Sequence, residues 1–296
     1  MQRFKDGKKI ALKYVYQIIV AVKEILTTEA TMTDHRLAED EQLTICGDTH
    51  GQYFDLCHIF ETNGFPSTEH AYLFNGDFVD RGSWSTEIAL VLYCYKWLMP
   101  NHMVISRGNH ETQDMNKVYG FEGECKAKYN ERVYRLFSES FSLLPLACLV
   151  HGEYLVLHGG LFSRDDVTLD DLRNINRHRK KQPGHEGLMM EMLWTDPQPQ
   201  PGRGPSKRGV GLQFGPDITA RFCDKNGLRG IIRSHEVRMD GYEVEHDGRC
   251  ITVFSAPNYC DSQGTKQSLC RHASSSPSNC IASSRADEYF SRATSQ

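Results

Sequence analysis

Six side chains with oxygen or imidazole nitrogen donors each stand just after a short run of apolar and β-branched residues. They are Asp48, His50, Asp77, Asn109, His158 and His235. Carboxylate and amide oxygens mixed with imidazole nitrogens suit Mn, Fe or Zn, whereas the lack of thiolates among them argues against a structural zinc site. Because these donors are too many for one ion, the pattern predicts two metal ions about 3.5–4 Å apart.

The donors divide into two sets if one carboxylate is shared. One ion would take Asp48, His50 and Asp77, and the other would take Asp77, Asn109, His158 and His235. Each residue alone has an ordinary explanation, because an Asp before a tight turn usually caps the backbone and a buried His usually completes a hydrogen bond. The same chemistry after five separate apolar runs is hard to obtain from turns alone, so the joint pattern favours a metal centre.

The apolar runs that precede the donors are predicted to be β-strands. They cover residues 43–46, 71–74, 103–106, 154–157 and 230–233. Helices are predicted at residues 8–30, 83–98, 129–141 and 216–226. Strands separated by helices indicate an α/β fold, in which ligands usually bind beyond the carboxyl ends of the strands. Residues 196–211 contain four Pro and four Gly and are predicted to form an exposed loop.

Five sequence blocks resemble the signature motifs of the phosphoprotein phosphatase family of metal-dependent Ser/Thr phosphatases. The blocks are GDTHG at 47–51, GDFVDRG at 76–82, RGNHE at 107–111, HGG at 158–160 and RSHE at 233–236. Stretches around them, such as LWTDPQPQ at 193–200, are most similar to the branch of the family that carries tetratricopeptide repeats ahead of its catalytic domain. The resemblance implies a single-domain α/β fold: a metallophosphatase-type β-sandwich of mixed sheets flanked by helices.

The resemblance also implies roles for residues around the ions. His110 would be the general acid that protonates the leaving serine or threonine oxygen, and Asp80 would hydrogen-bond its other ring nitrogen without being a ligand. The substrate phosphate would be bound by Arg81, Arg208, Asn109 and Tyr259. Two divalent ions are the implied cofactors, drawn from Mn, Fe, Zn or Mg, with Mn expected to support activity in vitro.

The implied reaction is hydrolysis of phosphoserine or phosphothreonine by in-line attack of a metal-bridging hydroxide on phosphorus. Two divalent ions and two carboxylates leave a net positive charge, which suits a phosphate dianion. Two other functions stay open at this point. One is a metallophosphoesterase that acts on nucleotides, and the other is a catalytically impaired, phosphatase-like protein that only binds phosphoproteins or partners.

Both ends of the chain depart from the family pattern. After NYCD at 258–261 the family continues with a further strand, whereas residues 262–296 contain ten serines and little apolar periodicity. We therefore predict a catalytic domain at 1–261 that lacks the final strand, followed by a disordered tail at 262–296. The sequence begins with one helix before the first motif, so no chaperone-docking repeats are expected.

Composition limits the partners. Lys and Arg total 34 against 38 Asp and Glu, a formal net charge of −4, so there is no general basic field for nucleic acid or anionic membranes. The expected partners are phosphoprotein substrates, without nucleic acid or a membrane. The ten cysteines form no CxxC pair and the sequence has no Asn-x-Ser/Thr site, which favours reduced thiols and a cytoplasmic or nuclear location.

Overall fold

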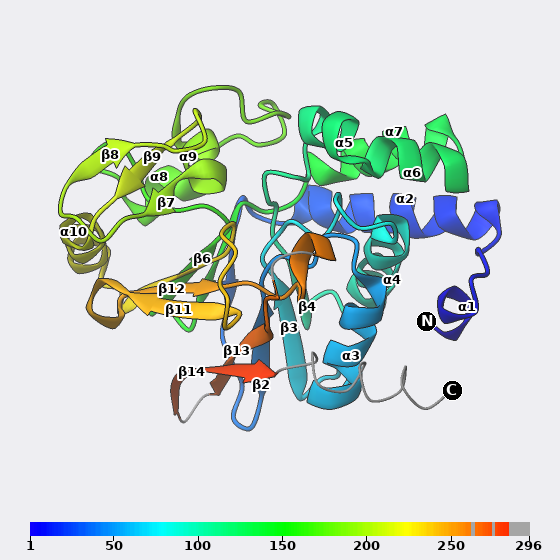
Figure 1. Ribbon diagram of the computed structural model, residues 1–296, viewed down its shortest axis with the longest axis horizontal. Helices are drawn as coiled ribbons and strands as arrows, with labels where there is room; N and C mark the ends of the chain where they lie inside the picture. Colours follow the sequence, from blue (N-terminus) through cyan, green and yellow to red (C-terminus); the bar gives the residue numbers. More distant parts are fainter. Residues whose placement is uncertain (262–263, 274–275, 284–296) are drawn as a thin grey trace.

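The computed structural model describes residues 1–261, 264–273 and 276–283, and it has the predicted α/β architecture. Two mixed sheets face each other at the centre, and helices cover their outer sides (Figure 1). The fold is therefore a β-sandwich flanked by helices, as the family resemblance implies. None of the helices in the described ranges has the length and apolar character needed to cross a membrane.

The helices follow the apolar periodicity of the sequence. They are α1 (Gln2–Lys5), α2 (Leu12–Thr28), α3 (Tyr53–Asn63), α4 (Ser85–Leu98), α5 (Gln113–Tyr119), α6 (Phe121–Lys128), α7 (Glu131–Phe141), α8 (Leu169–Arg173), α9 (Leu188–Trp194) and α10 (Pro216–Asn226), with 3₁₀ turns η1 (His246–Gly248) and η2 (Tyr259–Asp261). On α2, Val15, Ile19 and Val22 are buried while Tyr14 is exposed. This face packs against α4 and α7, so the predicted amphipathic helix covers one side of the sandwich.

The first sheet has six strands in the order β1-β5-β6-β10-β12-β11, and the second has five in the order β14-β13-β2-β3-β4. The first contains β1 (Met32–His35), β5 (Ala147–Val150), β6 (Tyr154–Leu157), β10 (Gly230–Arg233), β11 (Tyr242–Glu245) and β12 (Cys250–Val253). The second contains β2 (Gln42–Cys46), β3 (His70–Phe74), β4 (Met103–Ile105), β13 (Gln267–Ala273) and β14 (Ser276–Ser283). Since β2, β3 and β4 pair in parallel, as do β6 and β10, their carboxyl ends lie together in each sheet.

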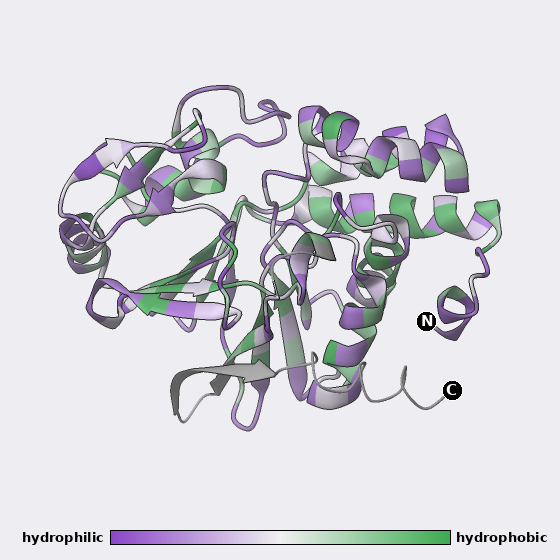
Figure 2. Cartoon of the chain, viewed as in Figure 1, coloured by the Kyte–Doolittle hydropathy of each residue, from purple (hydrophilic) through white to green (hydrophobic). Residues whose placement is uncertain are grey.

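Successive side chains of a strand point alternately to the space between the sheets and to the helices outside them. On β3, Ala71 and Leu73 face the other sheet, whereas Tyr72 and Phe74 join the cluster beneath α3 and α4. On β6, Val156 lies between the sheets, and its neighbours face the helices of the opposite side. Figure 2 shows hydrophobic residues along the inner strands of the sandwich, whereas outlying strands such as β8 and β11 also carry hydrophilic residues. The sandwich is therefore buried on both faces, which fixes the strand ends relative to one another.

The stretch at 196–211 differs from its prediction as one exposed loop. A three-stranded sheet of β7 (Asp196–Pro197), β9 (Leu212–Phe214) and β8 (Arg203–Pro205) forms there, with β7 and β9 parallel and β8 and β9 antiparallel. Pro197 and Pro205 are the last residues of β7 and β8, and Pro199 and Pro201 lie between these two strands, so none of these prolines stands where a missing N–H would be costly.

The carboxyl-terminal region also differs from its prediction. β13 pairs antiparallel with β2, so β2 has a neighbour on the side where the sequence predicts none. Strand β13 buries both polar and apolar side chains. Gln267 donates from Nε2 to Ser255 O at 3.2 Å, and Leu269 lies in the core beneath the helices. A strand with buried polar residues lacks the apolar alternation that a prediction needs. The parts of the predicted tail at 262–263, 274–275 and 284–296 lie outside the described residues.

Candidate metal centre

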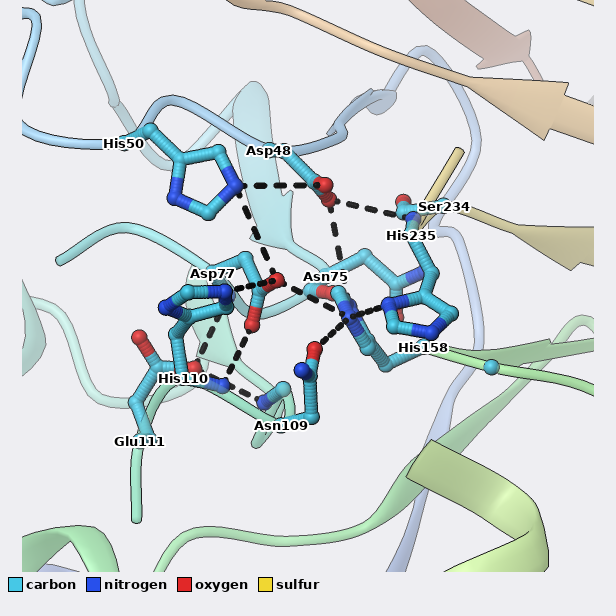
Figure 3. A network of polar contacts seen from close by, with 12 residues as sticks. Asp48, His50, Asn75, Asp77, Asn109, His110, Glu111, His158, Ser234 and His235 are labelled. Carbon is cyan, nitrogen blue, oxygen red and sulfur yellow. Dashed lines mark hydrogen bonds and ion pairs between the residues drawn. The ribbon is translucent and has the colours of Figure 1, made fainter. Parts of the chain in front are cut away.

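The six predicted donors come together at the carboxyl ends of β2, β3, β4, β6 and β10. Their side chains point toward a common centre (Figure 3), and all six are buried: Asp48, His50, Asp77, Asn109, His158 and His235. The segments that carry them are far apart in the sequence and meet because the strands pair in these two sheets.

Asp77 is the side chain around which the others are arranged. Its Oδ2 lies 3.3 Å from His158 Nε2 and 3.7 Å from His50 Nε2. Two groups of donor atoms that could each hold an ion share this residue: one adds His50 and His110, and the other adds His158 and His235. Asp77 thus has the position expected of a bridging ligand, while the ligation itself stays a prediction.

Backbone carbonyls orient two of the imidazoles. His50 Nδ1 lies 3.0 Å from Val79 O, and His158 Nδ1 lies 2.8 Å from Asn75 O. Because a carbonyl oxygen only accepts, each Nδ1 must carry a proton, and Nε2 is then the ring nitrogen directed at the centre. This is the tautomer that a metal-binding histidine needs.

Acceptor atoms face one another at the centre. Asn109 Oδ1 lies 3.0 Å from His158 Nε2 and is also directed at acceptor atoms of Asp77 and His235. His235 Nε2 is buried and has no hydrogen-bond partner among the described residues. Lone pairs gathered in this way are costly unless a cation lies between them. The donor set therefore fits divalent cations.

The pKa shifts of two donors also favour a cation at this centre. Burial and the negative charge of Asp77 raise the pKa of Asp48 to about 7. Burial, reinforced by His110, lowers the pKa of His50 to about 3. Two buried carboxylates this close repel each other, and a cation beside them removes that cost.

A hydrogen-bonded pair borders the donors. His110 Nδ1 lies 2.8 Å from Asp80 Oδ2. Burial would lower the pKa of His110, but the charge of Asp77 and the bond to Asp80 outweigh it and raise the pKa. Asn116, which the sequence does not single out, donates to Asp80 Oδ2 at 3.2 Å and to His110 O at 2.6 Å. Asn116 therefore links α5 to both members of the His110–Asp80 pair.

The predicted phosphate-binding side chains lie around the same centre. Arg208 Nη2 donates to His235 O at 2.9 Å, and its Nε donates to Asp196 Oδ2 at 2.6 Å. The Tyr259 ring centroid lies 5.2 Å from that of His50. Asp196 in β7 is a second residue that the sequence does not reveal, because no periodic pattern links it to Arg208 in the loop between β8 and β9.

Arg81 follows Asp80 directly and is exposed. Its guanidinium lies over the Tyr119 ring, 3.9 Å from the centroid. This stacking leaves the planar edge of the guanidinium available for hydrogen bonds.

Backbone strain is concentrated here. Positive φ angles occur at His50 (37°), Asp77 (48°), Asp80 (69°), Arg81 (71°) and His235 (70°). Non-glycine residues in this region are strained, and such residues cluster where a fixed side-chain geometry is needed.

Comparison with known proteins agrees with this geometry. A family model described as calcineurin-like phosphoesterase matches residues 42–239. Serine/threonine-protein phosphatase T of Aspergillus oryzae is 71% identical over 266 residues, which cover 90% of this chain and 56% of that protein. Human serine/threonine-protein phosphatase 5 is 58% identical over 90% of this chain and 53% of its own length. The chain thus spans about half the length of these curated relatives.

A solved structure is similar over nearly the whole chain. It is a Saccharomyces cerevisiae protein serine/threonine phosphatase described as similar to human phosphatase PP5, with a TM-score of 0.91 and 45% identity. The match covers 96% of this chain and 93% of that one.

The expectation that the chain has no chaperone-docking repeats is wrong. A second family model, described as the PPP5 TPR repeat region, matches residues 1–34. These residues form α1 and α2 and reach β1, and α2 packs on α4 and α7. An amphipathic helix that belongs to a repeat region has the same apolar pattern as one that only packs on the core, so periodicity alone does not separate the two.

Proposed function

The chain belongs to the calcineurin-like phosphoesterase family, and we propose that it is a metal-dependent hydrolase of phosphoserine and phosphothreonine in proteins. The observation that carries this proposal is the convergence of six buried donors beside the His110–Asp80 pair. The names of the relatives, serine/threonine-protein phosphatases T and 5, support the substrate class. Location in the cytoplasm or nucleus remains part of the proposal.

Two divalent ions would be held by the donors already assigned. Asp48, His50 and Asp77 would hold one, and Asp77, Asn109, His158 and His235 would hold the other. When bound, such ions neutralise phosphate charge and activate water as a nucleophile. Manganese is the ion that we propose for assays in vitro.

The chain's own side chains would bind the substrate and deliver a proton to the leaving oxygen. Arg81 and Arg208 would donate to phosphate oxygens, and Tyr259 would close the site above His50. His110 would give the proton on Nε2 to the leaving oxygen, because its Nδ1 is bound to Asp80. No nucleophilic Cys or Ser is needed for this reaction.

Added Mn²⁺ is expected to raise the melting temperature. At a free concentration of about 100 Kd, binding adds about 2.7 kcal/mol of stability, or about 5–10 °C for a domain of this size. Asp77→Asn is expected to remove most of this shift, because Asp77 is common to both groups of donors. Differential scanning calorimetry measures it, with the exposed Asp224→Asn as control. An undiminished shift in Asp77→Asn would exclude Asp77 as a shared ligand.

Substrate class is tested by parallel assays with Mn²⁺. A phosphoserine peptide is expected to be hydrolysed with a higher kcat/KM than a dinucleotide polyphosphate, because His110 and the two arginines suit a phosphate monoester. Preference for the dinucleotide would support the nucleotide-directed alternative. Lack of hydrolysis, together with phosphopeptide binding, would support the binding-only alternative.

A further inference from the structure

A loop between α8 and α9 carries a concentrated positive charge that the proposed reaction does not use. Residues 174–187 contain four Arg or Lys and one Glu, although the whole chain has a formal charge of −4. Arg179, Lys180 and Lys181 are consecutive and exposed. We call these three residues the basic tip.

The loop is anchored, so the basic tip has a defined place. Arg177 is buried, and its Nη2 donates to Leu26 O at 2.8 Å while its Nε donates to Leu143 O at 3.0 Å. Asn176 accepts from the backbone of the tip, with Oδ1 bonded to Arg179 N at 3.0 Å. The tip is thus a turn held at its base by a buried guanidinium.

The loop reaches the edge of the metal centre. Gln182 Oε1 accepts from Gln113 N at 3.3 Å, at the start of α5. Thr112, just before Gln113, donates to Asn109 O at 2.6 Å, so the loop contacts the segment that carries Asn109 and His110. Figure 1 shows the segment between α8 and α9 extending to α5. Since three residues span at most about 10 Å, the contact lies within about 10 Å of His110.

The charge of the tip is not neutralised by the protein. Within the part of the chain that the structure describes, Arg179 and Lys181 form no ion pair, and Lys180 Nζ donates to the backbone oxygen of Glu186 at 3.1 Å. The neighbouring carboxylate of Asp114 on α5 forms no ion pair with the tip either. None of the three cations has a carboxylate partner among the described residues, so their charge is open to an acidic ligand.

We infer that the basic tip binds acidic side chains of the substrate, about three to five residues from the phosphorylated residue. This inference rests on the proposed function and adds a substrate class: phosphoserine or phosphothreonine in an acidic sequence. An extended peptide advances about 3.3–3.6 Å per residue, which brings carboxylates at this spacing to the tip. Charge complementarity at an exposed surface affects encounter and KM more than the chemical step.

The test compares two phosphoserine peptides that differ only in flanking residues, Asp and Glu in one and Asn and Gln in the other. With Mn²⁺, the acidic peptide is expected to have a KM about tenfold lower at low salt, with similar kcat. The variant R179Q/K180Q/K181Q should lose this preference and keep its activity on p-nitrophenyl phosphate. The control K8Q/K9Q/K13Q removes the same formal charge near the start of α2 and should keep the preference.

The outcomes separate the two proposals. Equal KM values for both peptides, with normal hydrolysis of p-nitrophenyl phosphate, would overturn the inference and leave the proposed function intact. Failure to hydrolyse all three substrates would overturn the proposed function and the inference with it. If the triple variant loses affinity for a single-stranded oligonucleotide but keeps its preference for the acidic peptide, the tip is a nucleic-acid surface and the inference is wrong.

Discussion

His110→Asn is expected to lower kcat for a phosphoserine peptide by about 10²–10⁴-fold while leaving Mn²⁺ binding intact. Asn has nearly the reach of His110 but cannot deliver a proton to the leaving oxygen. The Nδ1 atom of His110 is already bound to Asp80 at 2.8 Å, so only Nε2 is available for this step. Steady-state kinetics with Mn²⁺ measure the loss in kcat.

Metal binding provides the decisive control for this variant. His110 belongs to one of the two groups of donors that could hold an ion, together with His50 and Asp77. If His110 were a ligand and not the acid, His110→Asn would also lose bound metal and the thermal shift with Mn²⁺. Near-normal kcat in His110→Asn would exclude His110 both as the general acid and as an essential metal ligand.

Asp80→Asn tests the partner of His110 and is compared with His110→Asn by its loss of kcat. Its amide could still contact His110, but the negative charge that favours the imidazolium would be gone. Partners that orient a site in this way typically contribute about 10–100-fold. We therefore expect a smaller loss of kcat than for His110→Asn, with an altered pH profile that a purely structural role would not produce.

The donors were predictable because each follows a recognisable apolar strand, and strand ends in parallel pairing meet at one edge of a sheet. Asp196 and Asn116 were not, because their partners Arg208 and His110 are fixed by tertiary packing and not by a period in the sequence. The fold class was predictable for the same reason as the donors. The short strands at 196–214 were hidden by their prolines and glycines.

The strand after residue 261 is a second feature that the sequence patterns do not predict. It lacks the apolar alternation of a strand, yet β13 pairs with β2 and Thr265 supports the loop of Tyr259. Thr265 Oγ1 accepts from Tyr259 N at 3.1 Å and donates to Ala256 O at 3.0 Å. Hydrogen bonds to backbone groups, and not apolar periodicity, place this segment. Tyr259 is thus held beside His50 by residues beyond the recognisable family motifs.

Gly108 has no side chain, and this allows its backbone to approach Asp77 closely. A Cβ at this position would lie 2.2 Å from Asp77 Oδ1, 2.5 Å from Asp77 N and 2.9 Å from Glu111 Oε2. Glu111 in turn accepts from the backbone N–H of Asp77 and of Gly108, both at 2.8 Å. The obstacle is therefore backbone and a hydrogen-bonded carboxylate, neither of which can move without disturbing Asp77.

Gly108→Ala is accordingly expected to destabilise the protein by about 3 kcal/mol, the upper part of the usual range for overpacking. The melting temperature would fall by about 6–12 °C, and the stabilisation by Mn²⁺ would shrink because Asp77 is displaced. Gly123→Ala on α6 is the matched control, since its added Cβ meets no described atom within 4 Å apart from its chain neighbours and the backbone of its own helix. That change should be neutral or stabilise by up to about 1 kcal/mol, because Ala favours helix. Equal melting temperatures for the two variants would show that the backbone at Gly108 relaxes, and that close approach to Asp77 is not required.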